Sequence, residues 1–263
     1  MSKNVPVAKP QESSGGLASL LELVVVIVEA LAIALVIRTL LFQPFNIPSG
    51  SMIPTLLVGD YVFVSKYSSG YSKYSILGSP NLFSGRVLGA EPKRGDVVVF
   101  KLPRDNETDY IKRVIGLPGD RIQMIDGRLY INNVMTPREP IAKARIEGRD
   151  GRLVEVPTYK ETLPGGVEHT VIEMDGDHGF YDNTDLYVVP PGNYFMMGDN
   201  RDNSTDSRVP MEDKGVGYVP FENLVGRAER IFFSFSMKED ESIFAFWRWP
   251  SAVRWDRILK VAH

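Results

Sequence analysis

The chain has 263 residues and a formal net charge of −3, from 30 Lys and Arg against 33 Asp and Glu. Charges of both signs are interspersed, which argues against a nucleic-acid-binding surface. There is no cysteine, so disulfides and thiolate metal sites are excluded. The three histidines, His169, His178 and His263, are too few and too scattered for most metal sites. We therefore expect no metal, no cofactor and no nucleic-acid partner.

A long apolar segment lies near the start of the sequence, over residues 17–37. Of its 21 residues, 18 are Leu, Val, Ile or Ala. At about 1.5 Å rise per residue, a helix of this length covers about 30 Å, the thickness of a bilayer's hydrocarbon core. Arg38 ends the run, although an apolar surface continues to Phe42. We predict a single transmembrane anchor over residues 17–42.

Two other structures share this composition. A cleavable signal peptide would fit the Ala-x-Ala patterns within residues 30–34, but its apolar core is only about 7–15 residues long. A buried helix of a soluble domain is usually shorter than this run. Length therefore favours a retained anchor. Glu22 and Glu29 are unusual within it, and Glu29 lies too deep to reach the headgroups, so we expect it to be protonated or to face a partner.

The residues that precede the anchor are polar and include Pro, Ser and Gly, so residues 1–16 are predicted to form a disordered tail. Lys3 and Lys9 are opposed there only by Glu12, which favours a cytoplasmic amino terminus. The remainder of the chain, residues 43–263, would then be an exported domain on the outer face of the membrane.

The exported part is predicted to be mainly β. Short β-branched and aromatic runs alternate with turn signals, and no long amphipathic helix separates them. We expect an antiparallel-sheet domain, with inserted stretches at residues 68–92 and at about 135–191, the second forming a lobe or a pair of hairpins beside the core. The predicted strands are residues 60–66, 96–101, 110–115, 121–125, 128–132, 187–189, 193–197 and 224–236.

The last twenty residues mix aromatic and basic side chains. Tryptophan beside arginine suits a membrane interface, but a terminal element packed on the core would have the same composition. The sequence leaves both interpretations open. The residues concerned are Phe244, Phe246, Trp247, Trp249 and Trp255, with Arg248, Arg254, Arg257 and Lys260.

A serine-containing turn follows the anchor within a few residues. Residues 48–56 read Pro-Ser-Gly-Ser-Met-Ile-Pro-Thr-Leu and place Ser49 and Ser51 where the helix would leave the bilayer. Serine beside proline and glycine does not continue a regular helix, so we expect an extended backbone that displays the hydroxyl. Ser51 is the first candidate for a nucleophile.

A serine nucleophile needs a neighbouring base to take its proton. His169 and His178 lie in no predicted element, and we expect loop histidines rather than a catalytic one. Lys112 is central in the predicted strand Tyr110–Ile115, on the same face as Tyr110 and Val114. Burial lowers the pKa of lysine and would yield a neutral amine, although a lysine in a strand is more often paired or partly exposed. Its spacing alone does not decide the role.

A third polar segment, residues 198–208, reads Gly-Asp-Asn-Arg-Asp-Asn-Ser-Thr-Asp-Ser-Arg. Ser204 could hydrogen-bond the lysine amine, and Asp206 could pair with Arg208 or Arg113 to brace the loop. A calcium loop is the competing interpretation, but Arg201 and Arg208 would lie among the ligands.

Together these segments resemble bacterial type I signal peptidases. The resemblance rests on Pro-Ser-Gly-Ser-Met-Ile-Pro-Thr-Leu, Tyr-Ile-Lys-Arg-Val-Ile-Gly-Leu-Pro-Gly-Asp and the 198–208 segment, in this order after an anchor. Gly59-Asp60, residues 94–100 and the sequence from Gly217 onward extend it over most of the exported domain. Some members of the family have two membrane segments before the serine, whereas this chain has room for one.

The resemblance implies a serine–lysine endopeptidase that removes signal peptides after Ala-x-Ala, through an acyl-enzyme. Ser51 would be the nucleophile and Lys112 the general base, while Ser49 would complete the oxyanion hole. Ser204 would orient the lysine, with Asp206, Arg208 and Arg113 supporting the loop. Shallow pockets for small side chains would be lined by Phe45, Ile47, Val99, Tyr110 and Ile111.

The implied partners are signal peptides of secretory preproteins, the lipid bilayer and the secretion translocon. The implied location is the bacterial inner membrane, with a single pass. Competing functions are a self-cleaving repressor-type protease, which would need a DNA-binding amino terminus, and a membrane-tethered binding protein with an inactive site. A penicillin-binding-type enzyme would require Ser-x-x-Lys, but Pro54 stands three residues after Ser51.

Overall fold

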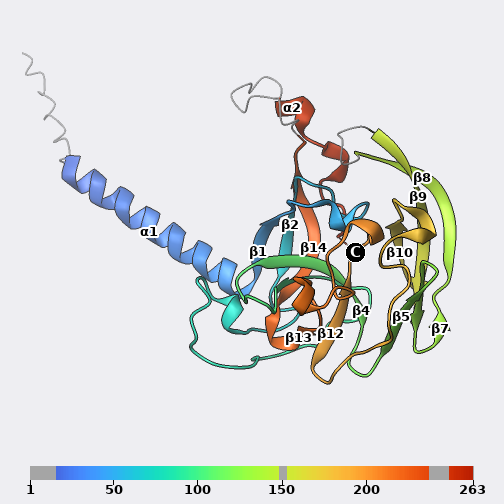
Figure 1. The fold of residues 1–263 in the computed structure, drawn as a ribbon. Coiled ribbons are helices and arrows are strands. Elements are labelled where there is room, and N and C mark those ends of the chain that lie inside the picture. The colour runs from blue at the N-terminus through green and yellow to red at the C-terminus, as the bar shows by residue number, and fades with distance from the viewer. Residues whose placement is uncertain (1–15, 148–152, 237–248, 263) are drawn as a thin grey trace, which may run out of the picture.

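The computed structural model describes residues 16–147, 153–236 and 249–262. Helix α1 (Gly16–Leu40) projects away from a body of β-sheets (Figure 1). Its stretch Ser19–Leu40 is long and apolar enough to cross a membrane, and none of it is buried against the body. The helix ends two residues before the predicted boundary of the anchor, because Phe42 begins a strand. The predicted tail over residues 1–16 lies outside the described residues except for Gly16, which begins α1.

The largest sheet contains seven strands in the order β1-β2-β14-β3-β4-β12-β13. Neighbouring strands pair antiparallel throughout this sheet. The predicted mainly β, antiparallel fold that follows one apolar amino-terminal helix is therefore confirmed. The strands are β1 (Phe42–Asn46), β2 (Asp60–Ser65), β14 (Leu224–Ser234), β3 (Val97–Lys101), β4 (Asp109–Gly116), β12 (Asn193–Met197) and β13 (Val219–Pro220).

Two smaller sheets complete the body. One has the order β11-β5-β6-β7, and the other has the order β10-β9-β8. The three-stranded sheet comes from the predicted insertion and stands apart from the large sheet (Figure 1). The bounds are β5 (Arg121–Ile125), β6 (Arg128–Ile131), β7 (Val134–Met135), β8 (Arg138–Glu147), β9 (Leu153–Leu163), β10 (Val167–Ile172) and β11 (Tyr187–Val188).

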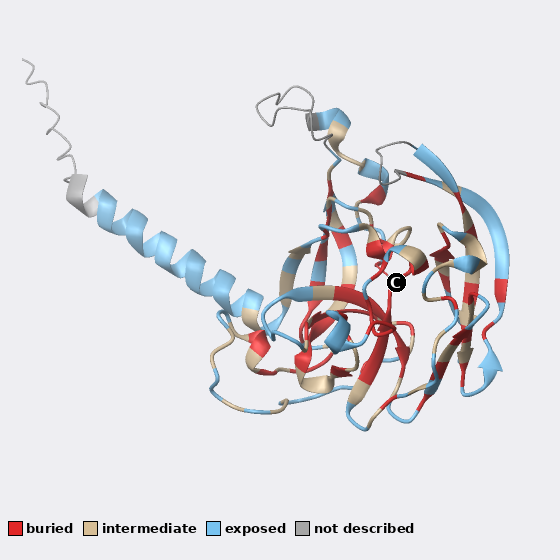
Figure 2. Cartoon of the chain, in the orientation of Figure 1, coloured by how far each residue is buried: buried red, intermediate tan, exposed pale blue. Residues whose placement is uncertain are grey.

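The core lies inside the body, whereas α1 is exposed from Ser19 to Leu40 except at Thr39, which is partly buried (Figure 2). Strand β3 is buried at four of its five positions, as its unbroken apolar sequence Val-Val-Val-Phe requires. Its two faces belong to different clusters: Val97 and Val99 pack in one, and Val98 and Phe100 pack in the other. All five residues of β3 pair with β4, so alternate residues of β4 also enter the two clusters. Side chains on β4, Lys112 among them, therefore begin from a well-packed backbone.

The carboxy-terminal segment packs on the core in its described part. The Arg257 guanidinium donates to both carboxylate oxygens of Asp60, the shortest contact being 2.6 Å, and to the Thr55 carbonyl oxygen at 3.0 Å. Ala262 is fully buried in the cluster that contains Val99, and Trp255 is largely exposed. Of the two interpretations of this segment, core packing therefore holds for Arg257 and Ala262. Phe244, Phe246, Trp247 and Arg248 lie outside the described residues, as does the side chain of Trp249.

Replacing Asp60 with Ala should destabilise the body strongly. The substitution leaves the buried Arg257 guanidinium without its carboxylate, and an unpaired buried charge costs about 3–5 kcal/mol. We expect a loss of that size in the free energy of unfolding, measured by urea denaturation of the detergent-solubilised chain. Asp256→Ala is the matched control, because Asp256 is exposed and pairs with Lys260 at the surface. Equal stability of the two variants would contradict the role of the Asp60 pair.

Candidate active site

Ser51 lies in a single 3-10 turn, Gly50–Met52, that follows β1. The expected extended backbone is found one position earlier than the turn, at Ser49, with φ −132° and ψ 155°. The expectation was wrong for Ser51 itself, because a three-residue turn is short enough to form between Pro48 and Pro54. Met52 is fully buried in the core and anchors the turn, while Ser51 is 6% exposed. A nearly buried hydroxyl is thus held in one orientation.

Lys112 reaches this hydroxyl from the middle of β4. Its Nζ lies 2.5 Å from Ser51 Oγ, at hydrogen-bond distance. The side chain is almost completely buried, and Nζ also lies 5.4 Å from the centre of the Tyr110 ring on the same face of the strand. Burial disfavours the charged amine and lowers the pKa of Lys112 to about 8. At neutral to alkaline pH a substantial fraction of Lys112 is therefore uncharged and able to accept a proton.

Two buried carboxylates near Lys112 oppose this effect of burial. Asp206 and Asp199 raise its pKa, while the Arg208 guanidinium lowers it. Each carboxylate has an arginine of its own: Arg208 donates to Asp206 at 2.9 Å, and Arg113 donates to Asp199 at 2.7 Å. Burial alone would raise the pKa of both acids, but these guanidinium groups hold it below the usual value. Because the carboxylates are already paired, neither holds the lysine amine as an ion-pair partner.

These contacts decide between the two pairings considered for Asp206. Asp206 pairs with Arg208 and also accepts a hydrogen bond from the Gly198 amide at 3.0 Å. Arg113 instead forms a two-pronged pair with Asp199, supported by a hydrogen bond of 2.5 Å from Thr55 Oγ1. The polar segment is thus braced internally by Arg208 and fixed to β4 by Arg113.

The same segment docks directly on the serine turn. The backbone amide of Asn200 donates to the Ser51 carbonyl oxygen at 3.1 Å, and the side-chain amide of Asn200 donates to the Gly50 carbonyl oxygen at 3.2 Å. Gly198 makes the approach possible, because a Cβ there would overlap Ser204 Oγ and would lie 2.5 Å from the Ser51 carbonyl oxygen. Sequence analysis assigned no role to Asn200, Asp199, Thr55 or Gly198, although all four lie in the quoted segments.

Ser204 lies beside Gly198, as the overlap described above indicates, and is buried. Its hydroxyl has no hydrogen-bond partner of normal geometry among the described residues, although it is close enough to Asp206 to contribute to lowering the pKa of that carboxyl. The only side-chain hydroxyl bonded to Lys112 in the described chain is that of Ser51. The role of Ser204 in orienting the amine stays a prediction.

Ser49 extends toward Ser51 from the solvent side. Its Oγ lies 3.5 Å from Ser51 Oγ, and the residue is exposed. A hydroxyl in this position is free to rotate toward a bound carbonyl oxygen, which is what an oxyanion hole requires. The structure holds no substrate, so the role of Ser49 also stays a prediction.

Four of the five predicted pocket residues lie together. Ile47, Val99 and Ile111 are buried in one apolar cluster, and Phe45 packs against it half-buried. Tyr110 is adjacent to Ile111 on β4 and therefore faces the other side, where it packs with Phe100. Val99 and Ile111 are directly opposite each other in the β3–β4 register. Their function as substrate pockets stays a prediction.

The histidines need one correction. His169 is not in a loop but in β10, where it is buried with Nε2 3.4 Å from Glu161. Glu161 also pairs with Arg201, so His169 lies beside a buried ion pair. The strand was not recognised because Val-Glu-His-Thr-Val-Ile has few apolar residues. His178 is exposed in a short turn, as expected.

Comparison with known proteins identifies relatives of this chain. The chain is 43% identical over 244 residues to the signal peptidase I of Rickettsia prowazekii, covering 88% of this chain and 89% of the relative. It is 46% identical over 211 residues to the signal peptidase I of Rickettsia conorii, covering 78% and 76%. A crystal structure of a signal peptidase I from Enterococcus faecalis is 26% identical, with a TM-score of 0.29, and covers 52% of this chain and 97% of its own. Residues 20–233 match the family described as signal peptidase, peptidase S26, and the chain belongs to that family.

Proposed function

We propose that this protein is a membrane-anchored serine endopeptidase that removes signal peptides from exported preproteins, cutting after an Ala-x-Ala-like sequence. Membership of the signal peptidase family supports the reaction and the substrate class. One observation supports the assignment of residues above all others: the amine of a buried lysine, Lys112, lies 2.5 Å from the hydroxyl of Ser51.

In this proposal neutral Lys112 is the general base. It accepts the hydroxyl proton as Ser51 Oγ attacks the carbonyl carbon of the scissile bond. The negative charge that develops on the carbonyl oxygen is stabilised by the Ser51 amide and the Ser49 hydroxyl. Protonated Lys112 then donates its proton to the departing amine, which leaves an acyl-enzyme on Ser51. Lys112 next activates a water molecule, which hydrolyses the ester and releases Ser51.

The remaining assignments concern the surroundings of the dyad. We propose that Ser204 orients the lysine amine and that Asp206, Arg208 and Arg113 hold its loop in place. The apolar cluster around Val99 and Ile111 would bind the small side chains that precede the cut. A larger side chain would have to displace residues that are already packed in the core.

We propose that α1 crosses the bacterial inner membrane once, with its amino terminus in the cytoplasm and the β body on the outer face. The aromatic side chains of Tyr61 and Phe63 on β2 are partly exposed, and they pair with β1, which follows the helix directly. Such rings suit the headgroup region of a bilayer. The secretion translocon is a further proposed partner, because it delivers the same substrates.

The first test is cleavage of a preprotein whose signal ends in Ala-x-Ala by the detergent-solubilised chain. The wild type should release the mature product, whereas Ser51→Ala should not. Lys112→Arg should reduce kcat/KM by about 10²–10⁴-fold or more, because arginine stays protonated and cannot act as a base. Product is measured by gel electrophoresis and its new amino terminus by mass spectrometry.

The matched control for this experiment is Lys101→Arg. Lys101 lies on neighbouring β3 and forms a surface ion pair with Asp109, so the substitution makes the same chemical change outside the site. It should retain wild-type cleavage. Wild-type activity in Lys112→Arg would contradict the neutral-lysine mechanism. Wild-type activity in Ser51→Ala would exclude Ser51 as the nucleophile.

The pH dependence of cleavage follows from the lowered pKa of Lys112. The active form is the uncharged amine, so its fraction rises with pH until the pKa of about 8 is passed. We expect kcat/KM to increase about tenfold per pH unit well below that value and to level off above it. Initial rates between pH 6 and pH 10 test this, with Lys101→Arg as the control for surface charge. A profile that is flat from pH 6 to pH 8 would show that no such base titrates.

Gly198→Ala should impair catalysis although glycine has no reactive group. The added Cβ would overlap Ser204 Oγ and press on the Ser51 carbonyl oxygen, so the loop and the serine turn must move apart. A displacement of about 1 Å in an active site can cost about 10²-fold, and we expect kcat to fall by about 10–10²-fold. Gly89→Ala is the control, since its Cβ would meet only side-chain atoms of Phe221 and Arg86. Unchanged kcat in Gly198→Ala would refute the close-approach argument.

A further inference from the structure

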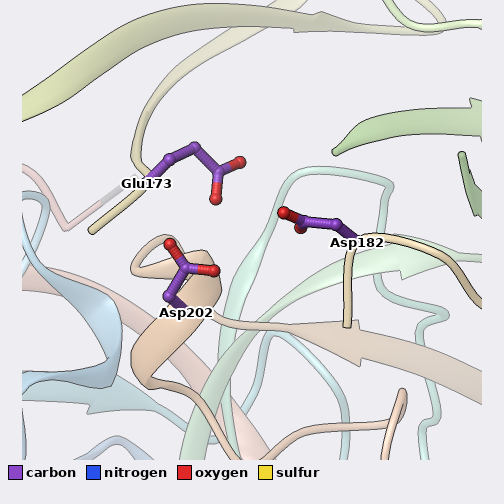
Figure 3. Close-up of side chains that lie close together, drawn as sticks. All are labelled: Glu173, Asp182 and Asp202. Atoms are coloured by element: carbon purple, nitrogen blue, oxygen red, sulfur yellow. The ribbon is translucent and has the colours of Figure 1, made fainter. Parts of the chain in front are cut away.

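Three carboxylates converge at one point, and one of them belongs to the polar segment 198–208, the active-site loop (Figure 3). Glu173 follows β10, Asp182 lies in the loop after the Gly176–His178 turn, and Asp202 lies in the turn Arg201–Asn203. Each side chain directs its carboxylate toward the other two (Figure 3), and one oxygen from each lies within 4.8 Å of the others. Glu173 and Asp182 are fully buried, while Asp202 is partly exposed. Three separate parts of the chain therefore meet at one point.

Two buried oxygens in this group have no hydrogen-bond partner. Glu173 Oε1 accepts from Arg138 at 3.0 Å, but Oε2 accepts from no described residue. Asp182 Oδ2 accepts from the Gly179 amide at 2.6 Å, whereas Oδ1 has no partner in the described chain. Buried carboxylate oxygens without a donor or a cation are costly. These two oxygens are therefore available to bind a cation or a proton.

The charges around the group do not balance. Of the three carboxylates only Glu173 forms an ion pair, with Arg138, and that arginine is shared with Asp177. Two other arginines act on the group from nearby, but Arg201 is paired with Glu161 and Arg208 with Asp206. The three carboxylates therefore carry more negative charge than the guanidinium groups paired with them neutralise.

The backbone is shaped to bring the carboxylates together. Gly179 lies against Asp202 so closely that a Cβ at this position would overlap Asp202 Oδ1, and it would also lie 3.3 Å from Asp182 Oδ2. The Asp175 amide donates to Asp202 Oδ2 at 2.8 Å and fixes the direction of that side chain. Asp202 is thus held toward the other acids although like charges repel one another.

We propose that Glu173, Asp182 and Asp202 form a binding site for a hard divalent cation, with Ca²⁺ as the best-fitting ion. Carboxylate oxygens are the ligands that Ca²⁺ and Mg²⁺ prefer. Ca²⁺ accepts oxygens at about 2.3–2.6 Å in flexible geometry, so three ligands spread evenly around it are about 4.0–4.5 Å apart. The octahedral geometry of Mg²⁺, at about 2.0–2.1 Å, places neighbouring ligands only about 3 Å apart. Water would complete the coordination from the side of Asp202.

The bound cation would join the insertion to the active-site loop. Asp202 is two residues before Ser204 and two after Asn200, the residue that holds the Ser51 turn. Glu173 directly follows β10, a strand of the sheet formed by β8, β9 and β10. The ion would therefore fix the loop from behind without touching the substrate. The expectation of a metal-free protein rested on cysteine and histidine content and, for the 198–208 segment, on Arg201 and Arg208 lying among the ligands of a calcium loop. In the structure these two arginines are paired with Glu161 and Asp206 instead.

The alternative occupant of the group is a proton. Burial raises the pKa of the Glu173 carboxyl to about 8, so without a cation this group is protonated at neutral pH. A proton shared between Glu173 and Asp182 would also satisfy both oxygens. The two possibilities differ in one respect: only the first makes the stability of the folded chain depend on the concentration of a metal ion.

Calorimetric titration of the EDTA-treated, detergent-solubilised full chain with CaCl₂, and separately with MgCl₂, tests the proposal without reference to proteolysis. We expect saturable binding of one Ca²⁺ per chain, tighter than Mg²⁺. At about 100 times the dissociation constant, Ca²⁺ should raise the melting temperature by about 5–10 °C. Asp202→Asn should weaken binding at least tenfold. Asp185→Asn is the control, because it removes an exposed acid from the same loop region and should leave binding unchanged.

A second variant guards against loss of folding in Asp202→Asn. Gly179→Ala keeps all three acids but displaces Asp202, so it should also weaken Ca²⁺ binding while the circular dichroism spectrum is retained. The proposal is overturned if the folded wild type binds neither ion, or if both variants bind Ca²⁺ as tightly as the wild type. Stabilisation by Glu173→Gln in a chain that binds no cation would identify the shared proton as the occupant.

Discussion

Burial of the Lys112 amine is the constraint on which the rest of the site depends. A lysine exposed to water would be protonated at the pH of growth and could not take a proton from serine. Its strand must therefore lie inside the sheet, and no carboxylate may hold the amine as an ion pair. The structure meets both requirements, because β4 lies between β3 and β12 and because Asp199 and Asp206 are bonded to arginines. The two arginines neutralise acids that would otherwise hold Lys112 in its charged form.

The same constraint explains why the polar segment at residues 198–208 is so rich in charges yet so well buried. Asp206 stabilises its own loop by accepting hydrogen bonds from the Gly198 amide and the Arg208 side chain. Asn200 then attaches that loop to the serine turn. Ser51 itself makes few contacts beyond Lys112 and Ser49, so its position is fixed largely through its neighbours. Removing any one of these supports would change the geometry of the site rather than its reactive groups, and this distinguishes them from the proposed Ser51–Lys112 dyad.

Sequence analysis identified the parts of the molecule that local pattern controls. Alternating or unbroken apolar runs located β2, β3, β4, β12 and β14 to within two residues, and the face of Lys112 followed from its position in β4. It failed where partners distant in the sequence decide the structure. Strand β9 carries charged residues such as Lys160 and Glu161, and the ion-pair partner of Glu161, Arg201, comes from a distant part of the chain. Asp60 likewise shows no sign in the sequence that its partner is Arg257, 197 residues away.

The anchor and the site are coupled by the short path between them. Helix α1 ends at Leu40, and Ser51 follows 11 residues later (51 − 40), so the hydroxyl lies within about 40 Å of the helix end even if that path were fully extended. Five of those residues form β1, which is paired with β2 along its length and cannot change its reach freely. If α1 spans a bilayer, the nucleophile is held at a fixed height above its surface. A signal peptide presents its cleavage site at that surface, so the helix contributes to substrate selection by setting where the serine can act.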